Sequence, residues 1–207
     1  MVAKMSRLAL LFIPLALASC SRDFQRVKFD ANEAAVYENT LSSSRQEKDT
    51  FFRANPASPL TADQKVSFQQ LNYYPPNLDL IFKVTLVKEK QPERVDIEAT
   101  GGEMRPAMKV GQFKFEVGGK VARLFVYEML GDGSGELFVP FTDLTCGKTS
   151  YAGGRYIDLK ENSSETYTLD FNYAYNPYCA YNHDYSCPIV PQENHLDVPI
   201  TAGEMKY

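Results

Sequence analysis

The side chains best suited to chemistry gather near the C-terminus, between Leu169 and Glu204. This stretch holds five of the thirteen tyrosines, two of the four cysteines and both histidines. It has no sustained helical or strand period after its first few residues. A long irregular stretch is uncommon in a packed domain unless its own side chains hold it together. The sequence therefore predicts an ordered, polar-cored loop that builds a site.

Acid–base chemistry could come from two carboxylates of this stretch, Asp170 and Glu204. Asp170 is predicted at a strand end, one hairpin after Arg155, so a buried Arg155–Asp170 pair is expected. As a structural feature, this pair would clamp the loop. As a functional feature, its guanidinium group would bind a carboxylate or phosphate. An enzyme built this way would use Asp170 or Glu204 as acid or base while Arg155 orients an anionic substrate.

Amide and tyrosine side chains supply the other polar groups of the candidate site. The asparagines either bind a ligand or hydrogen-bond backbone groups of the loop, and the second use is the commoner one at Asn176 and Asn182. The tyrosines either line a groove for a sugar or an aromatic ligand or pack beneath the loop. The expected ligand-binding residues are Tyr151, Arg155, Asp170, Asn172, Tyr175, Asn176, Tyr181 and Asn194.

The cysteines Cys146, Cys179 and Cys187 leave several kinds of chemistry open. They allow three single disulfides, each with one thiol left over. The stretch from Cys179 to Cys187 has the pattern Cys-x3-His-x3-Cys, with His195 further along, but the Cys-x2–4-Cys spacing typical of zinc is absent. A cysteine nucleophile would need a base such as His183 or His195. We predict no metal site.

The remaining composition and motifs exclude several classes of function. The chain has no GxGxxG or Walker pattern, so nucleotide binding is unsupported and no cofactor is expected. It has neither a G-x-S-x-G elbow nor a Ser/His/Asp order. With 22 basic and 26 acidic residues and no basic run, the chain does not have the pattern of a nucleic-acid-binding protein.

Two helices are predicted upstream of the sheet. Residues 31–55 are rich in helix formers and carry a thin apolar stripe, and Asn55-Pro56 ends this helix. Thr61 and Gln64 form a capping box for a short helix that extends to about Leu71.

From Leu80 onward the apolar period changes to two, which predicts strands. Gly118-Gly119 is a two-residue signal for a primed hairpin turn. The predicted strands are residues 79–88, 94–100, 112–117, 120–130, 136–141, 155–160 and 166–171. Their hairpin spacing predicts a mostly β fold, an antiparallel meander curled into a sandwich or partial barrel. N-terminal helices and a long ordered C-terminal loop complete this α+β arrangement.

The first residues have the pattern of an export signal. Lys4 and Arg7 precede an apolar run at residues 8–18, which is too short to span a membrane. The run ends in the sequence LASC, the pattern of a bacterial lipobox, in which Cys20 is diacylated and becomes the first residue. The alternative is an ordinary signal peptide with a cysteine near its cleavage site.

These signals predict a signal peptide at residues 1–19, a tether at 20–30 and a single domain at 31–207. Removal of the signal leaves 188 residues with a net charge of −6. Acyl chains on Cys20 would anchor the protein stably in the membrane of the cell envelope. Ser21 in place of aspartate favours the outer membrane, facing the periplasm, if the cell is Gram-negative.

Two long segments resemble a known family. PFTDLTCGKTSYAGGRYIDL at 140–159 and LDFNYAYNPYCAYNHDYSCPIVPQENHLDVPITAGE at 169–204 are similar to the family called domain of unknown function 1684. RQEKDTFF at 45–52 and SPL at 58–60 resemble its N-terminal pattern, so the resemblance covers about residues 45–207. Cys146 departs from the pattern, which has a small residue such as one with a hydroxyl group there. The family has no assigned reaction, so the resemblance implies which residues act together and not what they do.

The resemblance adds two expectations about side chains. Cys179 and Cys187 both lie in the family motif, which favours a disulfide between them in an oxidising envelope and leaves Cys146 free and buried. A bridge across so short a loop would contribute about 2–3 kcal/mol. The resemblance also favours a location near the site for Lys48 and its neighbours Arg45 and Asp49. Without the resemblance, these three residues would be interpreted as part of a solvated helix face. Neither histidine belongs to the family pattern.

Together these patterns predict an envelope lipoprotein, anchored through Cys20, that binds a small polar or anionic ligand such as a glycan or a carboxylated metabolite. One alternative is a hydrolase that uses Asp170 or Glu204. Another is a structural or partner-binding protein of the envelope. A pocket in which Arg155 and a carboxylate converge on open space would favour the first two hypotheses. A packed tyrosine cluster without a cavity would favour the third.

Overall fold

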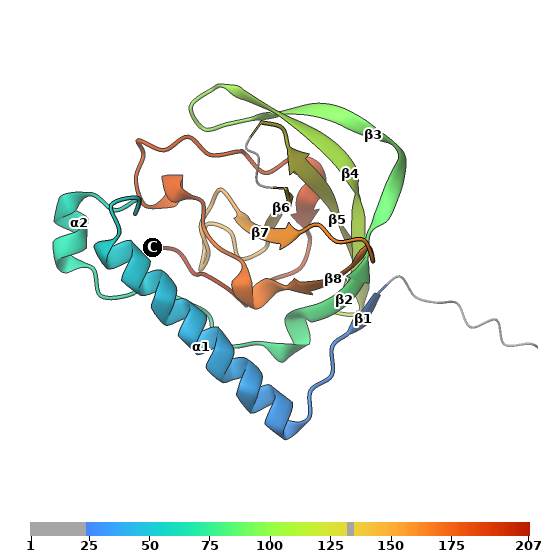
Figure 1. The fold of residues 1–207 in the computed structure, drawn as a ribbon, viewed down its shortest axis with the longest axis horizontal. Helices are drawn as coiled ribbons and strands as arrows, with labels where there is room; N and C mark the ends of the chain where they lie inside the picture. Colours follow the sequence, from blue (N-terminus) through green and yellow to red (C-terminus); the bar gives the residue numbers. More distant parts are fainter. Residues whose placement is uncertain (1–23, 132–134) are drawn as a thin grey trace, which may run out of the picture.

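The computed structural model describes residues 24–131 and 135–207, which form an antiparallel β fold with two helices on one side (Figure 1). The predicted signal peptide and Cys20 lie outside the described residues. The strands are β1 (Phe24–Arg26), β2 (Ile81–Thr85), β3 (Val87–Glu98), β4 (Met104–Val117), β5 (Lys120–Met129), β6 (Glu136–Asp143), β7 (Arg155–Lys160), β8 (Thr166–Asp170) and β9 (His195–Leu196).

The strands form two sheets. The smaller sheet has the order β1-β2-β8, and the larger has the order β3-β4-β5-β6-β7, with β9 added to β6. Every pairing is antiparallel except that of β9 with β6. Because β3 and β7 are the two ends of the larger sheet, it does not close into a barrel. The predicted mostly β fold is therefore confirmed in the form of a sandwich.

An aromatic core joins the two sheets. Leu86, which separates β2 from β3, is buried where the chain passes from one sheet to the other. The rings of Phe82 and Phe115 lie 5.2 Å apart across the core. Phe171, directly after β8, lies 5.3 Å from Phe115 and 5.2 Å from Phe141. Burial of such a side chain contributes about 1.5–3 kcal/mol, so this core fixes the point at which the C-terminal stretch begins.

The predicted strands are confirmed, with differences in extent, the largest of which is that β4 begins at Met104 and not at residue 112. Gly118 and Gly119 have φ angles of +59° and +74°, as a primed hairpin turn requires. The strand predicted at 94–100 begins earlier, because β3 runs without a break from Val87. Residues 90–94 of this strand are all exposed, so they lack the alternation of buried and exposed side chains that marks a half-buried strand.

Part of the predicted tether at 20–30 belongs to the folded domain. Strand β1 pairs with β2, with Phe24 opposite Val84, and Phe24 packs against the core. Three residues are too few to show a period, so residue pattern alone does not predict a strand here. The Asp30 side chain then accepts hydrogen bonds from the backbone of Asn32 and Glu33 and caps the first helix.

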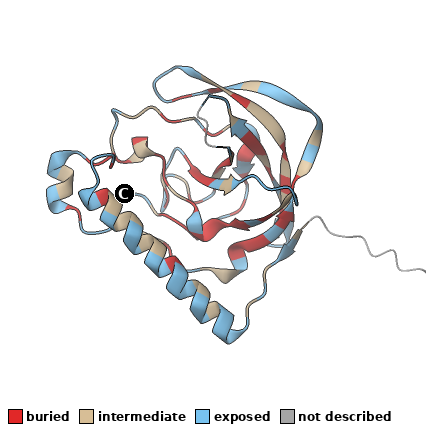
Figure 2. Ribbon diagram, in the orientation of Figure 1, coloured by how far each residue is buried: buried red, intermediate tan, exposed pale blue. Residues whose placement is uncertain are grey.

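The two predicted helices are present as α1 (Ala31–Ala54) and α2 (Ala62–Ser67). The predicted capping box of α2 is confirmed, because Thr61 and Gln64 hydrogen-bond each other's backbone N–H groups. Helix α2 ends earlier than predicted, and Leu71 instead donates its backbone N–H to Asp49 of α1 at 2.9 Å. Helix α1 is mostly exposed, whereas the buried residues follow the strands (Figure 2).

Residues 171–207, called here the C-terminal segment, run between α1 and the larger sheet (Figure 1). Apart from β9, the segment is built from turns and three short 3-10 helices, η2 (Phe171–Tyr173), η3 (Tyr178–Ala180) and η4 (Gln192–Asn194). Gly203 has a φ of +76°, and a Cβ atom there would lie 2.5 Å from the carbonyl oxygen of Ala174. Glycine is therefore required where the end of the chain packs against the start of the segment.

Candidate functional site

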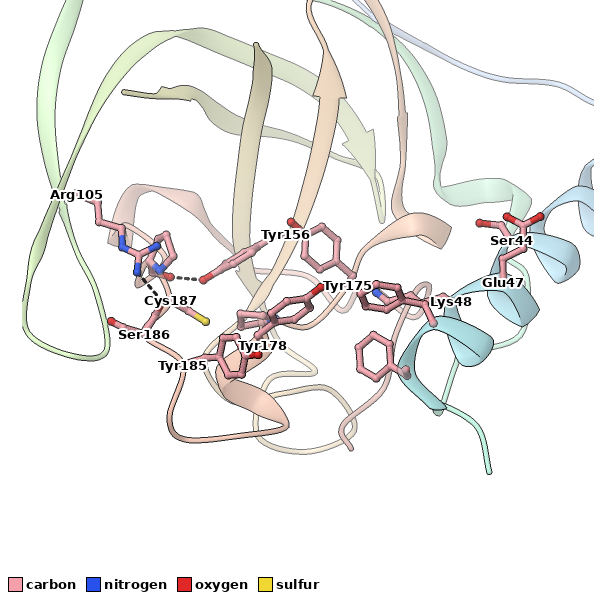
Figure 3. A pocket seen from close by; sticks show the side chains of 14 residues that line it. Ser44, Glu47, Lys48, Arg105, Tyr156, Tyr175, Tyr178, Tyr185, Ser186 and Cys187 are labelled. Atoms are coloured by element: carbon pink, nitrogen blue, oxygen red, sulfur yellow. Dashed lines mark hydrogen bonds between the residues drawn. The ribbon is translucent and has the colours of Figure 1, made fainter. Parts of the chain in front are cut away.

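A groove of about 740 Å³ lies between α1, the C-terminal segment and the larger sheet (Figure 3). A cavity of this size is typical of small-molecule sites. Its wall consists of Ser44, Glu47, Lys48, Phe51 and Phe52 from α1, Arg105 from β4, Tyr156 from β7, and Tyr175, Pro177, Tyr178, Tyr185, Ser186, Cys187 and Pro188 from the C-terminal segment. Rings make up most of the wall, and Figure 3 shows them between Arg105 and Lys48.

Lys48 and Glu204 form an ion pair at the α1 end of the groove. The Lys48 ammonium lies 2.5 Å from Oε1 of Glu204, whose side chain is buried. Oε2 of Glu204 accepts hydrogen bonds from the Tyr181 hydroxyl at 2.5 Å and from the Asn176 backbone N–H at 2.7 Å. Burial and the neighbouring carboxylate raise the pKa of Tyr181, so this hydroxyl stays protonated and donates. Glu204 is therefore a fixed counter-ion beneath Lys48.

Tyr175 and Tyr156 form the middle of the groove wall. Their rings pack edge to face with centroids 5.8 Å apart, and the Lys48 ammonium lies 4.9 Å from the Tyr175 centroid. The Tyr175 hydroxyl donates to Asp158 at 2.5 Å, and the Tyr156 hydroxyl donates to the carbonyl oxygen of Pro188. With both hydroxyl groups engaged, the two rings are held in place, and the groove has preformed apolar surfaces.

Arg105 lies at the opposite end of the groove. Its Nη2 donates to Glu103 at 2.9 Å and to the backbone carbonyl of Ser186 at 2.7 Å, and the side chain is 38% exposed. Its Nη1 has no hydrogen-bond partner in the described part of the chain. A further hollow of about 360 Å³ continues past this end and shares Arg105, Tyr156, Tyr175 and Pro188 with the groove.

The predicted Arg155–Asp170 pair is wrong, because Arg155 pairs with Asp143. Both side chains of this pair are fully buried, and Nη2 of Arg155 lies 2.9 Å from the Asp143 carboxylate. The guanidinium group also donates to the backbone carbonyls of Ile200, at 2.8 Å, and of Ala202. Arg155 therefore clamps the C-terminal segment to β7, and it does not line the groove.

Asp170 lies beneath α1. The Tyr37 hydroxyl donates to its Oδ2 at 2.8 Å, and the backbone and side-chain N–H groups of Asn172 donate to its Oδ1 at 2.9 and 3.0 Å. Burial raises the pKa of the Asp170 carboxyl. Asn172 in turn exchanges two hydrogen bonds with the backbone of Asn77. These contacts join the helix to the C-terminal segment, outside the groove wall.

The other two predicted asparagines bond the backbone. The Asn176 amide donates to the Met205 carbonyl at 2.8 Å. Asn194 is fully buried. Its amide accepts a hydrogen bond from the Phe125 N–H and donates one to the Phe125 carbonyl. It also donates to the Pro140 carbonyl at 2.7 Å. It fills the gap between β5 and β6, whose ladder has only two paired positions. These contacts match the structural use that was the commoner alternative for amides of the loop.

Cys179 and Cys187 lie next to each other as unbonded thiols. The backbone N–H of Cys179 donates to Sγ of Cys187 at 3.2 Å. The disulfide between them stays a prediction. Cys146 is half-buried and lies elsewhere, against Asp143 and Ser150. Tyr151 lies outside the groove, with its hydroxyl 3.9 Å from Sγ of Cys179, beside a second cavity of about 410 Å³.

Two further properties concern metals and membranes. In residues 24–131 and 135–207, no three His, Cys, Asp or Glu side chains gather into a metal-sized cluster. No helix in the described part of the chain is long and apolar enough to cross a membrane.

Several groove residues could not be selected from the residue pattern. Arg105 begins a strand and has no motif around it, so no feature of the sequence marks it. Lys48 was indicated by the family resemblance alone, and it does reach the site. Arg45 and Asp49 also face inward: Arg45 donates to the Tyr74 carbonyl at 3.0 Å, and Asp49 accepts from Leu71.

The fold and the groove define a class of protein, an antiparallel β-sandwich with a ligand-sized groove between an N-terminal helix and an irregular C-terminal segment. The sequence profile of the family described as "Protein of unknown function (DUF1684)" matches residues 66–205. The chain belongs to this family. The segments at 45–52 and 58–60 precede the matched residues.

A solved structure has a similar fold. It is the solution NMR structure of the uncharacterized protein from gene locus rrnAC0354 of Haloarcula marismortui, with a TM-score of 0.65 and 35% sequence identity. The match covers 84% of this chain and 96% of that chain. No curated protein matches the chain.

Proposed function

We propose that this protein is a lipid-anchored envelope protein that binds a small carboxylated molecule with a flat apolar face. The observation that carries this proposal is the groove of about 740 Å³, in which tyrosine rings lie between two cations, Lys48 and Arg105. Small-molecule sites typically combine apolar walls with a few fixed polar groups that orient the ligand.

The apolar face of the ligand would lie against the rings of Tyr156 and Tyr175. Fixed aromatic rings stack against a planar aromatic ring or against the C–H face of a sugar, so either a carboxylated aromatic or a uronic-acid sugar fits the same surface. Proline rings of the C-terminal segment, at Pro177 and Pro188, add apolar surface to the same wall.

The carboxylate would bind at Arg105 and not at Lys48. Both cations have a counter-ion, but Glu204 beneath Lys48 is buried, whereas the Glu103 side chain beside Arg105 is 46% exposed. The carboxylate of Glu47 also lines the Lys48 end. Arg105 is bonded through Nε and Nη2, so Nη1 remains for a ligand. A charge-assisted hydrogen bond from a guanidinium group to a carboxylate is stronger than one between neutral groups. The Lys48 end, with Ser44 and Glu47, would then bind hydroxyl groups.

Titration calorimetry with matched ligand pairs tests this proposal. The pairs are 2-naphthoate with 2-naphthalenemethanol, and galacturonate with galactose. We expect the acid of one pair to bind at least about tenfold more tightly than its neutral partner, because only the acid forms the charge-assisted bond. The pair that binds distinguishes an aromatic ligand from a sugar.

The variant Arg105→Gln is expected to lose this preference for the acid, while the matched control Arg94→Gln, at an exposed position on β3, keeps it. Equal binding of acid and neutral ligand by the wild type would contradict the proposal. So would an Arg105→Gln variant that binds like the control.

The hydrolase hypothesis has no comparable observation in its favour. The carboxylate oxygens of Asp170 and Glu204 are bonded within the chain, and neither residue lines the groove.

The lipid anchor is supported by the lipobox pattern at residues 17–20. Mass spectrometry of the mature N-terminus is expected to find acyl chains on Cys20, and Cys20→Ser is expected to release the protein from the membrane fraction. An unmodified N-terminus at Ser21 would rule out the anchor without affecting the groove.

A further inference from the structure

The cysteine pair lies in the wall between two cavities. Cys187 lines the groove, whereas Cys179 lines the second cavity of about 410 Å³ together with Tyr151 and His183. Tyr185 belongs to both walls. Each thiol is only slightly exposed, at 5% for Cys179 and 7% for Cys187. A small molecule in the second cavity would therefore meet Cys179 and not Cys187.

The two thiols are held in contact from both sides. Cys187 is fixed to the end of β3, where its backbone N–H donates to the Thr100 hydroxyl at 3.0 Å and its carbonyl accepts from the Thr100 N–H at 2.9 Å. Cys179 lies on η3, and its backbone N–H donates to Sγ of Cys187 at 3.2 Å. The two cysteines therefore already lie next to each other, and the surrounding chain does not have to move to bring them together.

The environments of the two sulfurs differ in a way that separates their roles. Hydrogen bonds from the Cys187 thiol and the Tyr151 hydroxyl lower the pKa of Cys179 to about 6. Burial and the neighbouring thiol raise the pKa of Tyr151 to about 12, so its hydroxyl stays protonated and donates. The pKa of Cys187 is raised, first by its bond to Cys179 and then by burial. Cys179 is the nucleophile of the pair, because the thiolate is the reactive form.

We propose that Cys179 and Cys187 form a thiol–disulfide exchange site that takes small disulfides through the second cavity. The Cys179 thiolate attacks one sulfur of the small disulfide, whose S–S bond breaks. A mixed disulfide forms on Cys179, and the other half of the molecule leaves as a thiolate that takes a proton from solvent. Cys187 then loses its proton to solvent, attacks Sγ of Cys179 and displaces the second half. The small disulfide is reduced to two thiols, and the cysteine pair is oxidised to a disulfide.

The reaction of the reduced protein with 5,5′-dithiobis(2-nitrobenzoate) tests this proposal. The protein is the full-length chain in detergent with Cys20→Ser and Cys146→Ser, so that two thiols remain. We expect about two equivalents of thionitrobenzoate to be released per chain, because attack and resolution each release one. The product is expected to carry no label and to have lost two hydrogens, as measured by mass spectrometry of the intact chain.

Two single variants assign the roles. Cys187→Ser is expected to release about one equivalent and to keep a stable label on Cys179, because the resolving thiol is missing. Cys179→Ser is expected to react at least about tenfold more slowly, because Cys187 lacks thiolate character and faces the other cavity. Alanine variants at both positions repeat the comparison if serine disturbs the fold.

Three results would overturn the proposal. One is a chain with both Cys179 and Cys187 that keeps a thionitrobenzoate label on each cysteine. Another is equal reaction rates for the two single variants. The third is a protein that reacts only after unfolding in urea, which would mean that the second cavity does not admit the reagent. None of these results bears on ligand binding at Arg105, which is measured separately.

Discussion

Arg155 holds an irregular chain end in place with one buried charge. Its guanidinium group pairs with Asp143 and donates to the carbonyls of Ile200 and Ala202. Burying a charge is costly unless it is paired and hydrogen-bonded, and here the partners come from two elements far apart in the sequence. Of the two roles predicted for this arginine, clamping the loop and binding an anion, its hydrogen bonds correspond to the first, although with Asp143 and not Asp170 as the partner.

Replacement of Arg155 by methionine is expected to lower the free energy of unfolding by about 3–5 kcal/mol, because the buried Asp143 carboxylate loses its positively charged partner. The measurement is urea denaturation followed by circular dichroism. Arg26→Met is the control: it removes the exposed pair of Arg26 with Asp79 and is expected to change the free energy by about 0.5 kcal/mol or less. Equal effects of the two variants would mean that Arg155 is not the clamp.

Tyr151 is a positioning residue for the thiol of Cys179, and pH dependence tests this role. The pKa of Cys179 is lowered to about 6 in the intact chain. In a chain without Cys20, Cys146 and Cys187, the rate of alkylation of Cys179 by iodoacetamide should rise with pH around a midpoint set by its thiol. Loss of the Cys187 thiol removes one donor, so this midpoint should lie above 6. Tyr151→Phe removes a further donor and should move the midpoint higher still.

An unchanged midpoint in Tyr151→Phe would mean that the hydroxyl does not act on the thiol. The titratable and charged groups that face the two cysteines are Tyr151, Tyr156, Arg105, His183, Asp184 and Tyr185. His183 lines the same cavity as the Cys179 thiol, so His183→Gln serves as the control and should leave the midpoint in place.

At the scale of elements, α1 and the C-terminal segment depend on each other. The C-terminal segment pairs with the larger sheet through β9 and through isolated bridges at Tyr175 and Pro188, and the groove lies between α1, this segment and the sheet. Phe52 packs edge to face on Tyr181 with centroids 4.9 Å apart, and Lys48 pairs with Glu204. The helix thus contributes one wall of the groove and the counter-charge for Glu204, a buried carboxylate of the C-terminal segment.

A double-mutant cycle measures this dependence. Lys48→Met, Glu204→Gln and the double variant are expected to give a coupling energy of about 1–3 kcal/mol, because the Glu204 carboxylate is buried and its partner is fixed. The same cycle on the exposed pair of Lys88 with Glu165 should give about 0.5 kcal/mol or less. Similar coupling in both cycles would contradict the link between α1 and the segment.

Sequence periodicity predicted most elements of the fold but few side-chain partners of the site. The alternation of Phe113, Phe115 and Val117 and the turn at Gly118-Gly119 are local signals, and β4 and its hairpin follow from them. Asp143 and Arg155, in contrast, lie at the two ends of the connection between β6 and β7, and no local period links them. By residue type, several carboxylates could equally pair with Arg155. Which of them does so depends on packing that no local pattern encodes.

At the scale of the whole molecule, the described domain begins close to the predicted anchor. Strand β1 starts at Phe24, four positions after Cys20. Four residues span at most about 14 Å, so an acylated Cys20 would hold the sandwich near the membrane surface. The tether predicted at 20–30 is therefore shorter than the sequence indicated, because Phe24 belongs to a sheet.

The central claim is that the groove between α1 and the C-terminal segment is a binding site. A crystal structure of the protein with the acid that binds in solution, 2-naphthoate or galacturonate, tests this claim most directly. We predict that the ring of the ligand lies against Tyr156 and Tyr175, with its carboxylate about 3 Å from Nη1 of Arg105. A ligand that occupies another hollow, or a groove left empty at a concentration that saturates binding in solution, would contradict the claim.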